Sequence, residues 1–111
     1  MKIINLTPHT ITLLGEKEIK FESQGVARAK QIETIAGEME ICGQKIPTVC
    51  MEYGEPEGLP EPKAGVCYIV SYITAMAAKV NGRKTEDLLM TADLIRNDDG
   101  QIVGCKKFSV L

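Results

Sequence analysis

The single histidine of this chain is its most obvious chemical group. His9 follows a Thr-Pro pair, and the proline would fix the direction of the chain that carries the imidazole ring. An imidazole titrates near neutrality, so it can transfer a proton or contact an anion. A hydrogen-bonded structural role explains a lone histidine equally well. Because no catalytic partner is visible in the sequence, both interpretations stay open.

A second candidate is Ser71, which lies between an apolar run at residues 66–70 and a helix expected at about 71–81. The first turn of a helix leaves backbone N–H groups free, and the helix dipole favours an anion there. Ser71 and the backbone of Tyr72 and Ile73 could therefore hold a phosphate group. A plain N-cap accounts for the same residue, since serine is a preferred capping residue.

Two arginines complete the candidate set. Arg83 follows the expected end of the helix, and Arg96 precedes an Asp-Gly turn. A guanidinium group binds phosphate or carboxylate through two parallel hydrogen bonds. Each arginine also has acidic neighbours in the sequence, so an ordinary ion pair explains either of them. Arg28, in a segment of mixed polarity, is a weaker candidate.

No metal ion or organic cofactor is expected. Asp98 and Asp99 lack the further oxygen ligands of a calcium loop, and the cysteines form no Cys-x-x-Cys pair. The common phosphate-loop, dinucleotide and nucleophile motifs are absent as well. In a reducing compartment the cysteines should act as small buried hydrophobic residues. They are Cys42, Cys50, Cys67 and Cys105.

Length and composition indicate one ordinary globular domain. The chain has 111 residues, a hydrophobic share of 44% and a charged share of 25%, so a single domain over residues 1–111 is expected. A net charge of −2 without a dense basic run argues against polynucleotide binding. The first residues do not resemble a signal peptide, and no apolar stretch has membrane-spanning length. We therefore expect a cytoplasmic protein without membrane contact.

The pattern of apolar residues predicts an α+β fold. It should be mostly antiparallel, with short strands and hairpins that can close part-way into a barrel. The main helix, at about 71–81, should end at Asn81-Gly82. Residues 26–33 are compatible with either a helix or a strand. The predicted strands cover residues 3–6, 10–14, 18–21, 39–42, 45–51, 66–70, 92–96 and 101–105.

A loop rich in proline and glycine occupies residues 54–62 and contains three of the five prolines. Such a segment can be neither a helix nor a central strand. It is a solvated connector, a lid or a contact with another subunit, and long ordered loops often carry function.

Five segments taken together carry a resemblance to a known family. They are Asn5–His9, Glu57–Pro60, Tyr68–Ser71, Gly82-Arg83 and Gly100–Gly104. In these segments the chain resembles the small "NLTPH" proteins of bacteriophages and bacterial genomes, and the likeness runs through most of its length. Some phage proteins of this size inhibit nucleotide-signalling immunity of the Thoeris or CBASS type. They sequester or cleave ADP-ribose-type or cyclic dinucleotide signals.

The resemblance implies a set of ligand-facing residues and a function. The implied function is sequestration of a small phosphorylated nucleotide by a phage anti-defence protein in the host cytoplasm. Since ligand sites often form between subunits, a homo-oligomer is expected. One alternative is a metal-independent phosphodiesterase with His9 as general acid or base, and another is a virion or host-protein interaction module. The implied ligand-facing residues are Asn5, Thr7, His9, Ser71, Arg83 and Arg96, with Tyr72 contributing its backbone.

Overall fold

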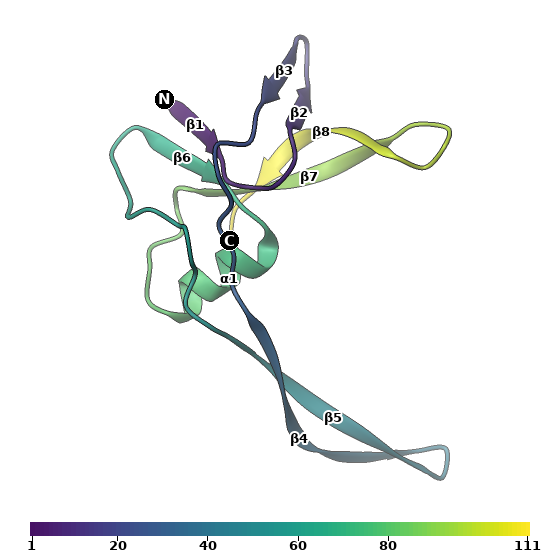
Figure 1. Cartoon of the computed structure of the whole chain (residues 1–111). Coiled ribbons are helices and arrows are strands. Elements are labelled where there is room, and N and C mark those ends of the chain that lie inside the picture. Colours follow the sequence, from purple (N-terminus) through teal and green to yellow (C-terminus); the bar gives the residue numbers. More distant parts are fainter.

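The computed structural model describes residues 1–111 and contains eight strands and one helix (Figure 1). The predicted α+β class is therefore confirmed. In chain order the elements are β1 (Lys2–Asn5), β2 (Ile11–Leu14), β3 (Glu18–Phe21), β4 (Gln31–Ile41), β5 (Gln44–Tyr53), β6 (Val66–Ile69), α1 (Tyr72–Val80), β7 (Leu88–Arg96) and β8 (Ile102–Ser109).

Six of the strands form one mixed sheet in the order β1-β6-β7-β8-β2-β3. The pairs β1–β6, β6–β7 and β8–β2 are parallel, whereas β7–β8 and β2–β3 are antiparallel. The prediction of a mostly antiparallel sheet is therefore only partly correct, because this sheet is mixed. One reason is that α1 lies between β6 and β7. A helical crossover returns the chain to the starting end of the sheet, so the next strand runs parallel.

The two edges of this sheet approach one another, so the sheet is almost closed into a barrel. At the end of β1, Asn5 forms a parallel bridge with Ser23, just beyond β3. The backbone N–H of Gln24 donates to the carbonyl oxygen of Asn5 at 2.9 Å. Between β8 and β2 the register contains the single pair Leu13–Cys105. The expected partly closed barrel thus has two weak junctions, one on each side of the β2–β3 hairpin.

Helix α1 has the predicted boundaries because both of its ends are capped. The Oγ of Ser71 accepts a hydrogen bond from the backbone N–H of Thr74 at 3.2 Å. At the other end, the backbone N–H of Asn81 donates to the carbonyl oxygen of Ala77 at 3.0 Å. Gly82 follows with a φ of +85°, a left-handed conformation that favours glycine.

The hydrophobic core lies between α1 and the strands β6 and β7. Ala75 and Ala78 have no exposed surface and belong to the same buried cluster as Tyr68, Leu88 and Met90. Small alanine side chains allow the helix backbone to approach the sheet closely. The predicted central strand is confirmed, since β6 lies between β1 and β7.

The contact between β8 and β2 leaves no room for a side chain at Gly104. A Cβ atom there would lie 2.8 Å from Leu14 Cδ1 and 2.9 Å from the carbonyl oxygen of Thr12. We expect Gly104→Ala to lower the free energy of unfolding by about 1–3 kcal/mol, because the added methyl overpacks the junction. Urea denaturation measures this change. Gly15→Ala is the control, since its Cβ would meet no atom closer than 3.9 Å. Equal stability of the two variants would contradict the prediction.

Strands β4 and β5 form a separate two-stranded antiparallel sheet, which we call the arm (residues 31–53). The arm extends away from the rest of the molecule (Figure 1). The whole chain, with the arm, has extents of 54 × 39 × 19 Å. The predicted hairpin is confirmed, but its strands are longer than the sequence pattern indicated. Part of the ambiguous segment 26–33 is extended chain at the base of the arm. Cys42 and Gly43 turn the chain at the tip with φ values of +51° and +78°.

The loop at residues 54–62 is attached to the body at several points. Its Glu57 and Arg28 exchange two backbone hydrogen bonds of 2.6 and 2.9 Å. Asn81 Nδ2 donates to the carbonyl oxygen of Gly54 at 3.3 Å, and Arg83 Nη2 donates to that of Pro60 at 2.8 Å. The loop therefore links the segment before the arm to the end of α1. The helix α1 has 9 residues, too few to span a membrane.

Candidate functional site

The turn between β1 and β2 is organised by the buried side chain of Asn5, which has no exposed surface. Its Nδ2 donates to the carbonyl oxygens of His9 and Phe21 at 2.7 and 2.8 Å. Its Oδ1 accepts from the backbone N–H of Thr7 at 2.9 Å and from Thr7 Oγ1 at 2.6 Å. In the free chain, Asn5 and Thr7 therefore hold this turn in place. A ligand contact by either residue stays a prediction.

Beside this turn lies a concavity of about 290 Å³, which we call the helix hollow. Three segments that are distant in the sequence meet there. Its walls include Thr7 and Pro8 from the turn, Ala27 and Arg28 from the segment before the arm, and Ser71 and Ile73 from the start of α1. The helix hollow therefore brings together two of the predicted site residues, Thr7 and Ser71.

The start of α1 lines the helix hollow through Ser71 and Ile73 and has free backbone donors. Ser71 Oγ also donates to Thr74 Oγ1 at 2.9 Å, and Thr74 Oγ1 donates to the carbonyl oxygen of Ala27 at 3.2 Å. Ser71 is thus a true N-cap, as one of its two interpretations predicted. The backbone N–H groups of Tyr72 and Ile73 donate to no carbonyl of the chain. They remain available to an anion, since the first-turn donors of a helix have no partner within it.

Arg83 does not reach the helix hollow, because it is bound at the opposite end of α1. Its Nη1 and Nη2 donate to the two carboxylate oxygens of Asp87 at 2.8 and 2.9 Å. Further hydrogen bonds run to the carbonyl oxygens of Lys84 and Pro60. The side chains of Arg83 and Asp87 are only 13% and 15% exposed. This bidentate ion pair is a structural element of the free chain.

Arg96 is also remote, and Arg28 takes the position beside the helix start. Arg96 Nη1 donates to the carbonyl oxygen of Gly100 at 2.8 Å, within the β7–β8 turn. Arg28 is exposed, and its guanidinium group forms no ion pair or hydrogen bond in the chain. From the sequence, Arg28 was the weakest of the three arginine candidates, because it lies in a segment of mixed polarity. Its backbone pairing with Glu57, a long-range contact, is what positions it.

His9 lines a different concavity, of about 310 Å³, between β2, β7 and β8. Cys105 lines the same concavity and is 1% exposed. Burial raises the pKa of the Cys105 thiol, and a hydrogen bond with the backbone of Ala92 only partly opposes this rise. A thiol that stays protonated at neutral pH is a poor nucleophile. This pair therefore does not resemble a Cys–His catalytic site.

The prediction that all four cysteines are buried hydrophobic residues is wrong for three of them. Cys42 and Cys50 are exposed on the arm, and Cys67 is half-buried, so only Cys105 is the buried small residue that was predicted. The strand-like context of these cysteines led to a wrong prediction, because Cys42 and Cys50 lie on a part of the arm where they stay exposed to solvent. No group of three or more His, Cys, Asp or Glu side chains is arranged to hold a metal ion.

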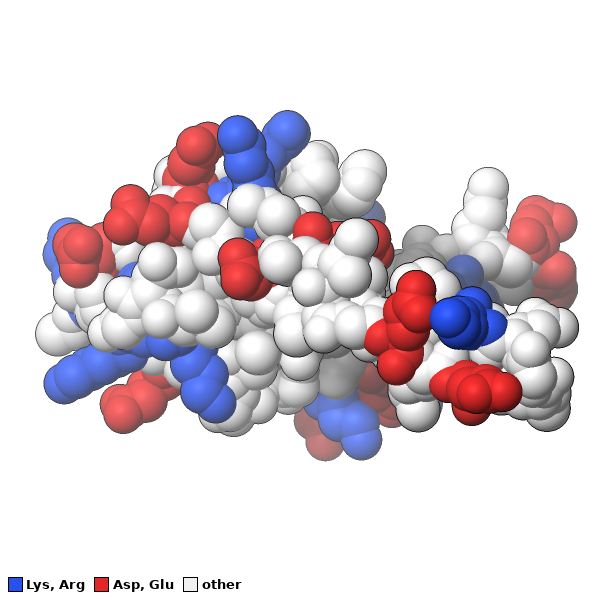
Figure 2. Space-filling view, turned by 90° about the horizontal axis from the view of Figure 1, so that it is seen from below, with Lys and Arg blue, Asp and Glu red and all other residues white.

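Charge on the surface is mixed. Figure 2 shows one face on which acidic and basic side chains are interspersed rather than gathered into a single-sign patch. Comparison of the chain with protein-family models, curated proteins and solved structures finds no match.

Proposed function

We propose that this protein binds a small phosphorylated nucleotide in the helix hollow without transforming it. The observation that carries the proposal is the position of Arg28. Its guanidinium group has no partner in the chain, and Arg28 lines the same concavity as Ser71 and Ile73 at the start of α1. A guanidinium group and a helix start both favour phosphate, and together they favour it more.

The other residues of the hollow suit the rest of a nucleotide. Pro8, Val26 and Ile73 provide apolar contact area for a base or a ribose. Ser71 holds the helix start in position, and Asn5 holds the turn that carries Thr7 and Pro8. A volume of about 290 Å³ accommodates part of a dinucleotide or one nucleotide unit.

The position of His9 supports a binder rather than a phosphodiesterase. A general acid or base must come within hydrogen-bond reach of the reacting group. His9 lines the concavity between β2, β7 and β8, whereas Arg28 and the helix start line the helix hollow. The imidazole and the proposed phosphate site therefore belong to separate concavities of the chain.

The resemblance to the NLTPH proteins extends this proposal to a biological role. Sequestration of an ADP-ribose-type or cyclic dinucleotide signal by a phage protein requires tight binding without turnover, in the cytoplasm of the host. An exposed arginine beside a helix start meets the chemical part of that requirement.

Isothermal titration with a panel of ADP-ribose-type and cyclic dinucleotide species tests the proposal. We expect one species to bind and Arg28→Ala to weaken its binding at least about tenfold, the loss typical of a charge-assisted hydrogen bond. Lys20→Ala is the control, since it removes one positive charge from an exposed side chain on β3. Absence of heat with every species, or equal losses in the two variants, would contradict the proposed site.

A second measurement separates binding from catalysis. The bound species is incubated with the protein, released by denaturation and analysed by chromatography. A binding protein returns the nucleotide intact. A cleaved product that disappears with His9→Ala would instead support the phosphodiesterase.

A further inference from the structure

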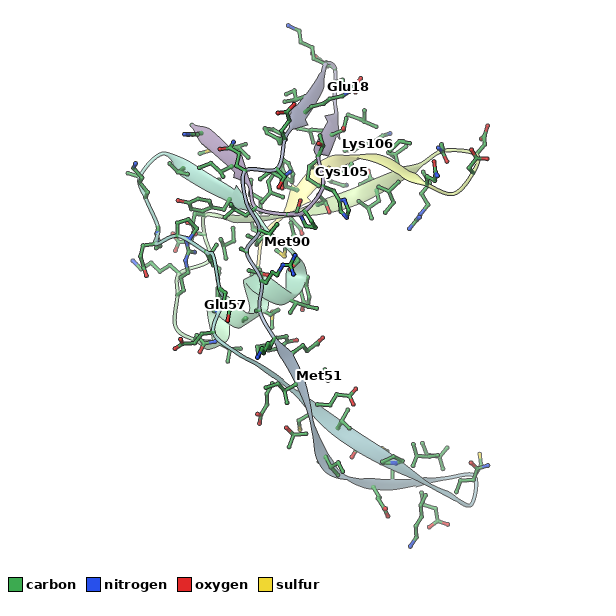
Figure 3. The ribbon with its side chains drawn as sticks, in the orientation of Figure 1. Glu18, Met51, Glu57, Met90, Cys105 and Lys106 are labelled. Carbon is green, nitrogen blue, oxygen red and sulfur yellow. The ribbon has the colours of Figure 1, made fainter.

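The arm exposes far more apolar surface than a strand pair normally leaves in water. All but three residues of β4 and β5 are exposed. Seven large hydrophobic side chains of the arm are at least 38% exposed, and Ile35 reaches 80%. An isolated two-stranded hairpin is marginally stable at best in water. Figure 3 shows Met51 on the arm, well away from Met90 and Cys105 in the body. Nothing in the chain covers this surface.

The register of the arm separates its residues into two faces of different character. Directly paired residues share a face, so Thr34–Cys50, Met39–Ile46 and Ile41–Gln44 lie together with Ile32. We call this the neutral face, and Glu52 at its base is its one charged member. The opposite face, which we call the charged face, contains Glu33, Glu38, Glu40 and Lys45 next to the apolar residues Ile35, Val49, Met51 and Tyr53.

A β-bulge produces this separation. The register shifts between Ile35 and Gly37, so Ala36 is an extra residue of β4. Without the bulge, Met39 and Ile41 would lie on the same face as Glu33 and Ile35, because strand side chains alternate. With it, they join Ile32. The bulge therefore gathers the apolar side chains of the arm tip onto the uncharged side.

The chain exposes more surface than a compact chain of its mass. The accessible surface is 7846 Å² for a chain of 12.1 kDa, whereas a compact monomer of that mass exposes about 6,000 Å². The radius of gyration is 17.2 Å, against about 13 Å for a compact domain of this length. The excess, about 1,800 Å², is what one partner contributes to an obligate homodimer interface.

We propose that the neutral face of the arm packs against the same face of a second copy of this chain, forming a two-fold dimer. In such a dimer each surface meets its own copy. Pairing of the charged faces would bring Glu33, Glu38 and Glu40 of both copies into one interface with only Lys45 from each copy to balance them, which is repulsive. The neutral face instead brings Met39, Ile41 and Ile46 of the two copies together. This inference does not depend on the nucleotide site.

Sedimentation equilibrium of the full chain tests the dimer. Wild-type protein should have the mass of two chains. Ile46→Glu should raise the dissociation constant at least about a hundredfold, since each dimer would bury two unpaired carboxylates. Ile35→Glu is the matched control. It adds the same charge to a more exposed residue of the same arm, on the charged face, and it should leave the mass at two chains.

Circular dichroism verifies that each variant is folded. If Ile46→Glu loses its structure, Ile46→Thr takes its place. It keeps a β-branched side chain and should still weaken the dimer at least about tenfold through lost apolar contact. A wild-type mass of one chain at every concentration overturns the proposal. So does a dimer that survives substitution of Ile46, or one that dissociates equally with Ile35→Glu.

Discussion

Asn5→Ala should lower the free energy of unfolding by about 3–5 kcal/mol, because several hydrogen bonds are lost at once. The substitution removes the side-chain donor to the carbonyl oxygens of His9 and Phe21 and the acceptor of the Thr7 backbone N–H, and only Thr7 Oγ1 still donates to His9. Asn5 has no exposed surface, so little water can replace the lost donor and acceptor. Asn5 also forms the bridge to Ser23, where the two edges of the sheet meet. Its substitution should therefore destabilise both edges.

Asn97→Ala is the matched control for this substitution. Asn97 Oδ1 also accepts two backbone hydrogen bonds, from Asp99 and Gln101, but Asn97 is exposed in the β7–β8 turn. Water can replace these bonds, and a loss of about 1 kcal/mol or less is expected. Urea denaturation of both variants gives the comparison. A loss for Asn5→Ala no larger than that of Asn97→Ala would refute the structural role of Asn5.

Arg83→Met should cost about 3–5 kcal/mol of stability, because it leaves the carboxylate of Asp87 largely buried without its counter-charge. The pair is bidentate, and its two side chains are 13% and 15% exposed. Arg83 Nε is buried without a partner, so the site already contains one unsatisfied donor. The backbone of Asp87 also accepts from the N–H of Tyr68 in the central strand β6. A shift of the Asp87 backbone would therefore also disturb the buried Tyr68 of the core.

The double variant Arg83→Met/Asp87→Leu isolates the ionic component. Removing both charges should recover at least about half of the loss, since neither partner is left unpaired. The double variant still lacks the hydrogen bond from Arg83 to the carbonyl oxygen of Pro60 in the loop, so the recovery of stability should be incomplete. Arg96→Met serves as control, because that arginine makes one exposed hydrogen bond to Gly100. Thermal unfolding of the set measures the differences. If the double variant is less stable than Arg83→Met, unpaired charge is not the cause.

Local chemistry determined the elements that the sequence predicts well. Ser71 and Asn81-Gly82 cap α1, and these residues act on backbone groups only a few positions away. The Asp-Gly turn before β8 and the glycine turn at the arm tip are equally local. Such interactions do not depend on the rest of the fold, so residue type and spacing are sufficient to locate them.

Strand pairing was decided by the tertiary structure. An alternating pattern shows that a strand has one buried face, but it does not identify the neighbouring strand or its direction. The parallel pairs β1–β6 and β8–β2 join segments far apart in the chain. The arm was underestimated for a related reason. Gly37 and the bulge beside it interrupt the period of two, so β4 reads as two unrelated pieces in sequence.

The candidate site shows the same division. The sequence alone determined that a helix would begin at Ser71 and offer free backbone donors, because that depends on one turn of chain. It also identified arginines as suitable anion ligands. Which arginine is available was decided only in three dimensions. Asp87 engages Arg83, the β7–β8 turn engages Arg96, and pairing with the distant Glu57 brings Arg28 to the helix. Side-chain availability depends on long-range contacts, and a local pattern does not contain them.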